Sequence, residues 1–110
     1  MSKPVINIVG LSCGPEMDDK LNKWYNKVHI PMLMKNKKMK KVYRFRRLTN
    51  DENYPKYIAV YKFDNREDFD SYNTSQELVA AIEEAQETWK AGGPVEKARI
   101  QYELINSFEQ

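Results

Sequence analysis

Apolar residues follow two different periods along the chain, and together these predict four strands and two helical regions. Four segments either alternate apolar with polar positions or are apolar at nearly every position, as strands do, and these are 4–13, 39–48, 56–63 and 97–108. The segments between the first and second strands and between the third and fourth repeat apolar residues every three or four positions, as amphipathic helices do. The predicted order is strand, helix, strand, strand, helix, strand.

The first predicted helix begins at Glu16, where acidic residues suit the positive end of a helix. Its apolar stripe comprises Met17, Leu21, Trp24, Val28 and Met32. Pro31 lacks a backbone N–H, and its ring disfavours helical geometry at the residue before it. We therefore expect this helix to stop or kink at His29 and Ile30, with a final turn that reaches Asn36.

The second helical region is expected to break near Asn73. Asn65 can cap a short helix, and Thr74, followed by Glu77 three residues later, has the form of a capping box that opens a longer one. The glycines and proline of 92–94 end that helix. Its expected apolar stripe comprises Leu78, Val79, Ile82, Ala85 and Trp89.

This order of elements fits a ferredoxin-like α+β fold, a βαββαβ sandwich in which two helices cover one face of a four-stranded antiparallel sheet. A chain of 110 residues and 13.0 kDa has the ordinary size of one domain. No stretch of it is long enough to join two separate cores. We therefore assign residues 1–110 to a single domain.

Two of the predicted strands are apolar on both faces. The first has Val5, Val9 and Leu11 on one face and Ile6 and Ile8 on the other, and the third has Tyr57, Tyr61 and Phe63 on one face and Ile58 and Val60 on the other. Two helices cannot cover both faces, and the uncovered patch is larger than monomers usually expose. Because burial contributes roughly 25 cal/mol per Å² of apolar surface, we expect a homodimer packed sheet to sheet. The alternative is that the aromatic side chains border solvent.

Composition excludes several classes of partner. Apolar residues make up 41% of the chain, charged residues 31%, and the mean hydropathy is −0.79, so no run is long enough to span a membrane. The net charge of +2 gives no field that would gather nucleic acid. Cys13 is the single cysteine, and the start of the chain lacks the apolar region of a secretory signal, so we expect a cytoplasmic protein without disulfides.

The single histidine, His29, is the residue best suited to acid/base chemistry. Its unperturbed pKa near 6.5 allows proton transfer near neutral pH. Tyr25 and His29 are four residues apart and therefore share one flank of a helix, beside Trp24 and Val28, where an imidazole can face a cavity. The alternative is a half-buried histidine that ends a helix and bonds a backbone carbonyl.

The residues around His29 and the two strands that follow them resemble a known family. The pattern Trp24-Tyr25-x-x-Val28-His29-x-Pro31, followed by the strands at 42–48 and 57–63, is similar to the EthD-like branch of the dimeric α+β barrel superfamily. The resemblance covers residues 4–72 well and the rest by element order. It implies a dimeric barrel with an apolar cavity between helices and sheet in each subunit, into which His29 looks.

Relatives in that superfamily include polyketide cyclases, cofactor-free monooxygenases that act on aromatic substrates, and proteins without an assigned activity. This chain departs from many of them, because 35–41 is rich in lysine where they carry a Pro-Gly turn. The haem-degrading members use an Asn, a Trp and a His. Here Trp24 and His29 both fall in the first helix and the third strand has no Trp, so Asn7 does not complete that set and we do not predict haem.

We therefore expect a small cofactor-independent enzyme, or a ligand-handling relative of one, that binds an apolar or aromatic metabolite beside the first helix. His29 is the expected acid/base for a cyclisation, dehydration or oxygenation. The expected substrate-binding residues are Asn7, Trp24, Tyr25, Tyr57, Tyr61 and Tyr102. Strand phase does not show whether the strand tyrosines, Tyr43 among them, face the cavity or the dimer interface.

The competing hypothesis is a non-catalytic dimer that senses a metabolite or stabilises a partner enzyme. No metal is expected, because one histidine without a carboxylate at helical ligand spacing makes no coordination shell. The five lysines of 35–41 could meet a phosphate, a coenzyme A tail or an acidic partner, or could form a solvated loop.

Overall fold

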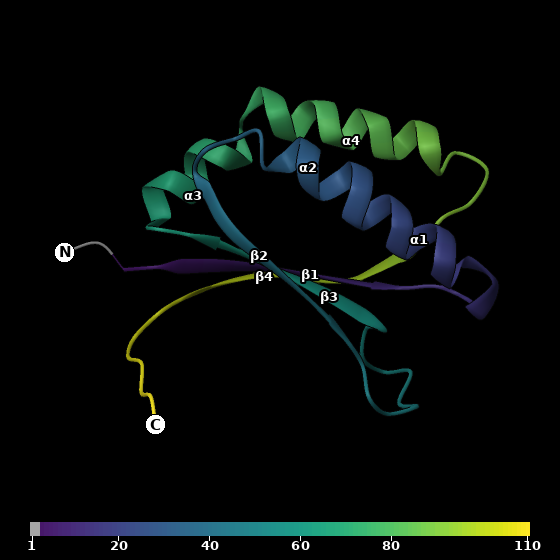
Figure 1. Cartoon of the computed structure of the whole chain (residues 1–110), viewed down its shortest axis with the longest axis horizontal. Helices are drawn as coiled ribbons and strands as arrows, with labels where there is room; N and C mark the ends of the chain where they lie inside the picture. The colour runs from purple at the N-terminus through teal and green to yellow at the C-terminus, as the bar shows by residue number, and fades with distance from the viewer. Residues whose placement is uncertain (1–2) are drawn as a thin grey trace.

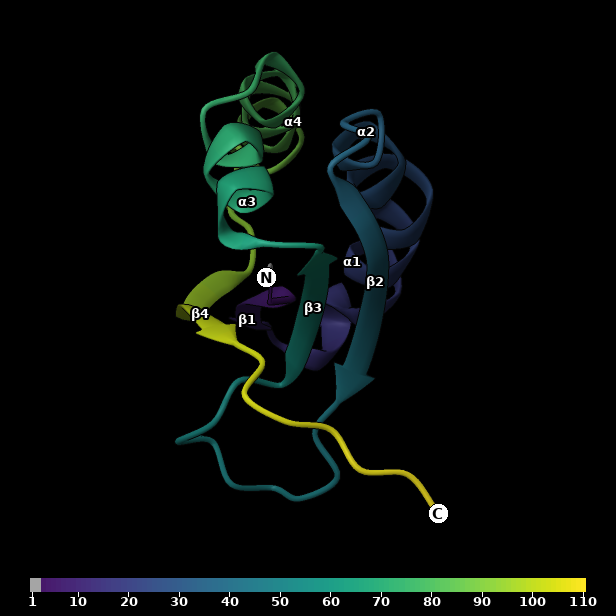
Figure 2. The same ribbon diagram turned by 90° about the vertical axis from the view of Figure 1, so that its left-hand side faces the viewer.

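The strands form one antiparallel sheet with the order β2-β3-β1-β4 in the computed structural model, which describes residues 3–110. The strands are β1 (Val5–Ser12), β2 (Met39–Arg46), β3 (Tyr57–Phe63) and β4 (Val95–Glu103). All helices lie on one side of this sheet (Figure 1), in two neighbouring columns when the molecule is viewed end on (Figure 2). The ferredoxin-like fold class is confirmed.

The helical elements follow the predicted order. They are a 3-10 turn at Pro15–Met17, α1 (Asp18–Trp24), a π-helical segment at Tyr25–His29, α2 (Ile30–Leu33), α3 (Arg66–Asn73) and α4 (Gln76–Thr88). In residues 3–110 there is no helix with the length and apolar character needed to cross a membrane. Part of the expectation about a secretory signal rests on Met1 and Ser2, which lie outside the described residues.

The first helix does not stop at His29 and Ile30, and the irregularity expected there takes the form of a π-helical segment that ends at His29, followed by the short helix α2. His29 and Ile30 keep helical backbone angles, and the helix continues through α2. The widened segment before the proline explains why: Ile30 N–H bonds the carbonyl of Tyr25, five residues back. The wide turn also relieves the clash that a proline ring makes with the preceding turn of a regular helix.

The break between α3 and α4 is confirmed near Asn73, but the capping residue is different. Asn65 caps α3 as predicted, because its Oδ1 accepts from the N–H of Asp68 at 2.8 Å. Ser75, not Thr74, caps α4, since its hydroxyl accepts from the N–H of Leu78 at 3.2 Å. Both residue types are good caps, and the chain turns one residue later than the capping-box pattern indicates.

The α4 stripe is buried less than its periodicity predicts. Ala81 is the fully buried residue of this helix, whereas Val79 and Ile82 remain nearly half exposed. The reason is visible in Figure 1, where α4 lies at the outer edge of the helical layer and packs against α2 rather than down onto the sheet. A small side chain at Ala81 permits this close helix contact.

The core lies between the helices and one face of the sheet. Cross-strand register places Val5, Asn7 and Val9 opposite Phe63, Tyr61 and Ala59, and these six are all buried. Leu21, Tyr25 and Leu33 bury against them from the first helix. The core face is therefore the tyrosine-rich face of the two central strands.

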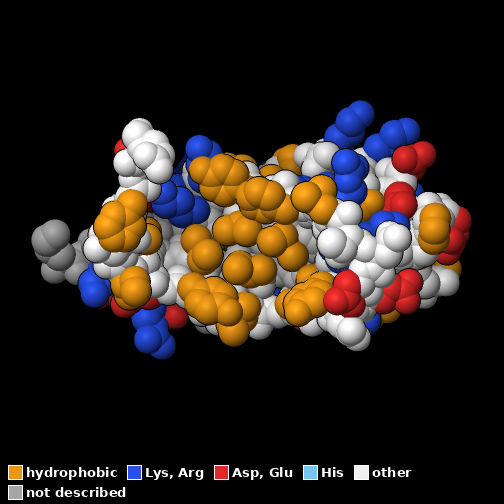
Figure 3. Space-filling view, turned by 90° about the horizontal axis from the view of Figure 1, so that it is seen from below, with side chains coloured by type: hydrophobic (Ala, Val, Ile, Leu, Met, Phe, Trp, Pro, Cys, Tyr) orange, Lys and Arg blue, Asp and Glu red, His pale blue; other side chains and the backbone are white. Residues whose placement is uncertain are grey.

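The opposite face of the sheet is apolar and uncovered. Register places its members side by side, and they are Ile6, Ile8, Tyr43, Phe45, Ile58, Val60, Ala98, Ile100 and Tyr102. Figure 3 shows this face as a continuous hydrophobic patch across the centre of the molecule. We call it the open face. The tyrosines thus divide, with Tyr57 and Tyr61 in the core and Tyr43 and Tyr102 on the open face.

The last strand ends earlier than predicted. β4 stops at Glu103, and the N–H of Leu104 makes one further bond to the carbonyl of Pro4 at 2.8 Å. The neighbouring strand β1 begins at Val5, so the pairing of β4 with β1 ends close to this point, although the alternating pattern continues in the sequence.

Candidate functional site

A cavity of about 300 Å³ lies between the first helix, α4 and the sheet. Among its lining residues are Trp24, Tyr25, His29, Ile82, Trp89 and Arg99. Its walls are mostly apolar and aromatic, and its polar atoms come from few side chains, which is the usual composition of a small-molecule site. Three of the residues expected at a site, Trp24, Tyr25 and His29, meet here.

The π-helical segment Tyr25–His29 positions the histidine. In a regular helix, residues five apart point about 140° away from each other, whereas the wider turn brings them to one side. Trp24 and His29 are five apart, and their rings stack with centroids 4.6 Å apart. Tyr25 meets the same imidazole edge to face at 5.0 Å. The widened helix therefore presents all three rings to one place.

Contacts from α4 hold the stacked indole. Trp24 Nε1 donates to Glu84 Oε1 at 2.8 Å, and Thr88 Oγ1 donates to the other oxygen of that carboxylate. The rings of Trp24 and Trp89 meet edge to face at 5.5 Å. Because Trp24 is fixed by both a hydrogen bond and ring packing, it forms a rigid wall for His29.

His29 is held neutral by its surroundings. Loss of hydration on burial lowers its pKa from 6.5 to about 4, the positive charge of Arg99 acts in the same direction, and Glu84 opposes both. Its Nδ1 is buried and has no hydrogen-bond partner among residues 3–110. Trp89 Nε1 is likewise buried and has no hydrogen-bond partner among these residues. Two unpartnered nitrogen atoms thus belong to residues that line the cavity, which is unusual in an interior where polar groups are nearly always paired.

Arg99 brings a positive charge to the cavity, and it was not among the site residues predicted from the sequence. β4 carries it on the helix-facing side, opposite Val9. Glu96 accepts from its guanidinium at 2.6 Å, and this pairing raises the pKa of Arg99. The alternation of the last strand places Arg99 on the face opposite Ile100 and Tyr102. That polar face would normally be expected to point into solvent, so the alternation alone does not indicate a cavity residue. Trp89 was likewise expected only as core.

A buried pair of hydroxyl groups lies beneath the cavity wall. The hydroxyls of Tyr25 and Tyr61 hydrogen-bond to each other, and both side chains are almost fully buried. Burial raises the pKa of both phenols, most strongly that of Tyr61. The guanidinium of Arg44 lies over the ring of Tyr25, 4.5 Å from its centroid. Tyr61 therefore supports Tyr25 from behind rather than lining the cavity.

The structure places Asn7 and Tyr102 outside the lining of this cavity. Asn7 is buried in β1, and its side-chain oxygen accepts from Gln101 at 2.8 Å, so its polar group is occupied by the neighbouring strand. Tyr102 is on the open face, opposite Ile6, with the whole sheet between it and His29. The alternation along β4 sends Tyr102 to the face opposite that of Arg99.

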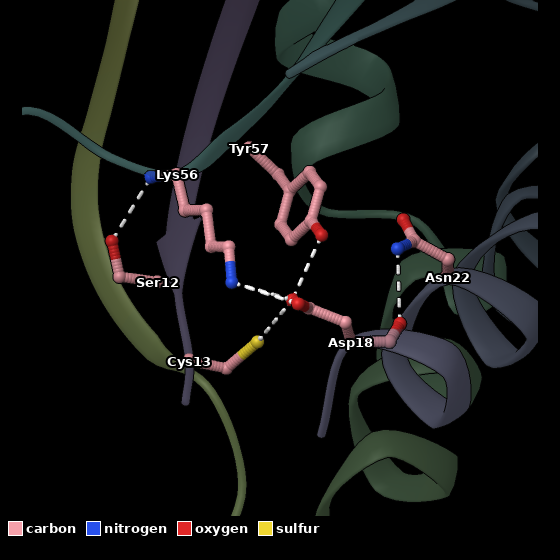
Figure 4. A network of polar contacts seen from close by, with 6 residues as sticks. All are labelled: Ser12, Cys13, Asp18, Asn22, Lys56 and Tyr57. Atoms are coloured by element: carbon pink, nitrogen blue, oxygen red, sulfur yellow. Dashed lines mark hydrogen bonds and ion pairs between the residues drawn. The ribbon is translucent and has the colours of Figure 1, made fainter. Parts of the chain in front are cut away.

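Tyr57 is also outside the lining of the cavity. Its hydroxyl belongs to a separate polar network (Figure 4). It donates to Asp18 Oδ1 at 2.8 Å, and Lys56 Nζ pairs with the same carboxylate at 2.8 Å. The hydrogen bonds from Lys56 and Tyr57 hold the pKa of Asp18 below its usual range. Cys13 Sγ also donates to Asp18, and burial raises the pKa of that thiol. The network joins the ends of β1 and β3 to the start of α1.

The lysine-rich segment 35–41 is partly paired with acidic residues of the chain. Lys38 lies 3.5 Å from Asp68, and Lys40 lies 3.9 Å from Asp64. Both lysines are exposed and the distances are long, so these pairs contribute little to stability. In the part of the chain that the structure describes, no three His, Cys, Asp or Glu side chains come together as a metal site would require.

Comparison with known proteins gives a family but no activity. A family described as "Domain of unknown function (DUF4286)" matches residues 5–92, which includes the first helix, α3 and α4. No curated protein shows significant similarity to the chain.

Solved structures share the fold. An EthD family protein from Bacillus halodurans is 15% identical, covers 96% of this chain and 100% of its own, and superimposes with a TM-score of 0.66. A dimeric protein of unknown function with a ferredoxin-like fold from Bacteroides fragilis is 20% identical, with coverages of 92% and 96% and a TM-score of 0.62. A hydroxynitrile lyase from Passiflora edulis is 18% identical, with coverages of 99% and 100% and a TM-score of 0.61. The expected resemblance to the EthD-like dimeric α+β barrels is confirmed at the level of the fold.

Proposed function

The chain belongs to the DUF4286 family of domains of unknown function, and from its cavity we propose that it is a small cofactor-independent enzyme, or a ligand-handling relative of one, that binds an apolar or aromatic metabolite beside the first helix. The observation that supports this most is the neutral, partly buried His29, which lines a cavity of about 300 Å³ walled by two indoles. A volume of this size is at the lower end for small-molecule sites.

In this proposal His29 acts first as a base. With a pKa of about 4, the imidazole is neutral at pH 7 and has a free lone pair to accept a proton from a bound ligand. Protonating it in the free protein at pH 7 costs about 4 kcal/mol, so a role as the initial acid is disfavoured. A cyclisation, a dehydration or an oxygenation of an acidic carbon can each begin with such a deprotonation.

Arg99 would stabilise the negative charge that develops when the ligand loses its proton. Its guanidinium lines the cavity together with His29, and it keeps hydrogen-bond donors beyond those used by Glu96. A fixed positive charge near a developing enolate or phenolate lowers the barrier most when the site excludes water. We assign to Arg99 the role of polarising the bound ligand.

The second candidate is a dimeric binding protein without turnover, and two observations favour it. No carboxylate or carbonyl orients the Nδ1 of His29 within residues 3–110, whereas catalytic histidines are usually held by such a partner. A pKa of about 4 is also far from the neutral range in which a general base is most effective. A cavity that only binds a ligand needs neither an orienting partner for the histidine nor a histidine pKa near neutrality.

We further propose that the protein works as a homodimer through the open face. Tyr43, Phe45, Ile100 and Tyr102 remain about half exposed there, and a structural neighbour is described as dimeric. Pairing two such faces removes apolar area that a single subunit leaves in water. Cys13, the single cysteine, is free, which fits the reducing cytoplasm that we propose as its location.

Intrinsic fluorescence tests the cavity directly, because Trp24 and Trp89 are the chain's two tryptophans and both line it. A panel of small phenols, aromatic carboxylic acids and apolar lactones is titrated against the purified protein, and hits are incubated and examined by mass spectrometry. A true ligand changes the emission in the wild type and loses at least tenfold in affinity in the Ile82→Trp variant, which fills the cavity.

The matched variant for catalysis is His29→Gln. If the protein is an enzyme, this variant retains the fluorescence response and loses at least a hundredfold in turnover. A ligand that binds and is recovered with its mass and its chromatographic retention both unchanged assigns the protein to the binding class. A panel without any saturable response in the wild type would contradict both forms of the proposal.

A further inference from the structure

The segment Leu104–Gln110 leaves the sheet with two large apolar side chains in solvent. After the bond between Leu104 and Pro4, the segment makes no further backbone bond to β1. Ile105 is 90% exposed and Phe108 is 88% exposed. Figures 1 and 2 show the segment running off below the sheet, on the side away from the helices. It therefore extends over the side of the molecule that carries the open face.

The open face contains a hollow of about 250 Å³ at the opposite end of the sheet. The residues that line it are Phe45, Arg46, Arg47, Tyr54, Pro55 and Ile58. Its floor is aromatic and aliphatic, and two arginines stand at its side. Neither arginine forms an ion pair with a carboxylate in residues 3–110, although Arg47 donates to the carbonyls of Thr49 and Tyr54. The hollow thus offers an apolar site next to uncompensated positive charge.

Phe108 cannot reach the hollow of its own chain. Leu104 lies one residue beyond Glu103, which pairs with Val5, whereas Ile58 of the hollow pairs with Gly10. Six residues along an antiparallel strand span about 20 Å, and two to three strand spacings across the sheet add about 10–14 Å in the perpendicular direction. The four residues from Leu104 to Phe108 span at most about 14 Å. The segment is therefore too short for this contact within one subunit.

A second copy removes the lengthwise separation. When two sheets pack face to face about a two-fold axis perpendicular to the strands, the end of one sheet lies over the opposite end of the other. Leu104 of one subunit then stands above the end that carries the partner's hollow, with an offset of about 10–14 Å across the strands and about 10 Å between the sheets, which together make about 14–17 Å. Four extended residues span about 14 Å, and the side chain of Phe108 covers the rest.

We infer that, in the homodimer proposed above, the segment Leu104–Gln110 of each subunit crosses onto the other and places Phe108 in the hollow beside Phe45, Tyr54 and Ile58. Glu109 follows directly and meets the charge of Arg46 and Arg47. The two contacts are compatible. Phe108 and Glu109 are neighbours in the chain, and the apolar floor and the two arginines are neighbours in the hollow. This inference rests on the homodimer and is independent of what the cavity binds.

Disulfide trapping tests the contact without relying on stability. In a Cys13→Ser background, the pair Phe108→Cys and Tyr54→Cys is oxidised mildly and run on a non-reducing gel. We expect a covalent dimer from the double variant and not from either single variant. The pair Phe108→Cys and Ile6→Cys is the matched control, since a segment folded back onto its own sheet would give an intramolecular link there instead and would overturn the inference.

A second measurement uses the dimer dissociation constant from analytical ultracentrifugation. Phe108→Ala is expected to raise it at least tenfold, whereas Val79→Ala, an exposed apolar position on α4, leaves it unchanged. A dimer that forms no disulfide between positions 54 and 108 in the double variant and tolerates Phe108→Ala would overturn the crossing segment while the homodimer stands. A wild-type protein that sediments as a monomer would overturn both.

Discussion

The indole of Trp24 lies almost flat on the imidazole of His29, with ring planes 23° apart. The two residues are five apart, so this stack exists only because the helix widens between them. The same indole is held by Glu84 of α4. The position of the imidazole is therefore set by α4 as much as by its own helix.

Burial of His29 makes the stability of the protein depend on pH between about 4 and 6.5. In that window the unfolded chain binds a proton at His29 and the native protein does not, so the free energy of unfolding falls as the pH is lowered. The loss approaches about 3 kcal/mol at pH 4 as an upper value. Urea unfolding at pH 7, 6, 5 and 4 measures it. His29→Gln is expected to flatten the difference, and an unchanged pH dependence in that variant would show that another group is responsible.

The hydroxyl pair of Tyr25 and Tyr61 is expected to behave as one unit. Removing one hydroxyl leaves the other buried without a partner, so Tyr25→Phe and Tyr61→Phe should each lower the free energy of unfolding by about 1–2 kcal/mol. The double variant should lose clearly less free energy of unfolding than the two single losses added together, because it leaves no buried hydroxyl without a partner. Chemical denaturation of all four proteins at pH 7 completes the cycle. Additive losses would contradict the pairing.

Asp18 is expected to stabilise the junction of β1, β3 and α1. Its carboxylate accepts from Lys56 and Tyr57, and Asp18→Asn removes the charge that Lys56 pairs with. Because the group is partly exposed, the expected loss is about 1 kcal/mol at pH 7. Asp19→Asn, at the exposed neighbouring position, serves as the control. The low pKa of Asp18 means that its contribution is present at neutral pH and disappears as the pH falls through that pKa, so the two variants should converge in acid below it.

A charge in the middle of the open face should separate the proposed dimer. Ile8 lies at the centre of the sheet, between Val60 and Ile100, and Ile8→Asp would place an unpaired carboxylate between two apolar sheets. Light scattering after size-exclusion chromatography is expected to change from two subunits to one. Val79→Asp on α4 should leave the mass unchanged. A wild type that already elutes as one subunit would contradict the dimer.

Much of the fold follows from the sequence because periodicity decides which face each side chain takes. The alternation in strands one and three correctly separated Tyr61 from Val60. The first helix was harder, since a proline normally ends a helix, and nothing in the residue types indicates a widened turn that accommodates it. The shift of the α4 cap from Thr74 to Ser75 is of the same kind, because two good capping residues stand side by side.

The candidate site was predictable only where it is local in sequence. Trp24, Tyr25 and His29 lie within six residues, and helical spacing alone groups them. Trp89 and Arg99 reach the same cavity through α4 and an edge strand, and no spacing rule connects them with His29. Asn7 and Tyr57 both lie on the helix-facing side of the sheet, but the sequence does not show that Gln101 and Asp18 already occupy their polar groups.

The widened segment Tyr25–His29 holds one residue more than regular helical spacing requires. Asn26 and Lys27, both exposed, are the positions at which the chain can absorb or lose that surplus residue without touching the core. A homologue one residue shorter at this point would therefore show an alignment gap next to the histidine. An imidazole matched to His29 by alignment column alone would then point towards a different wall of the molecule.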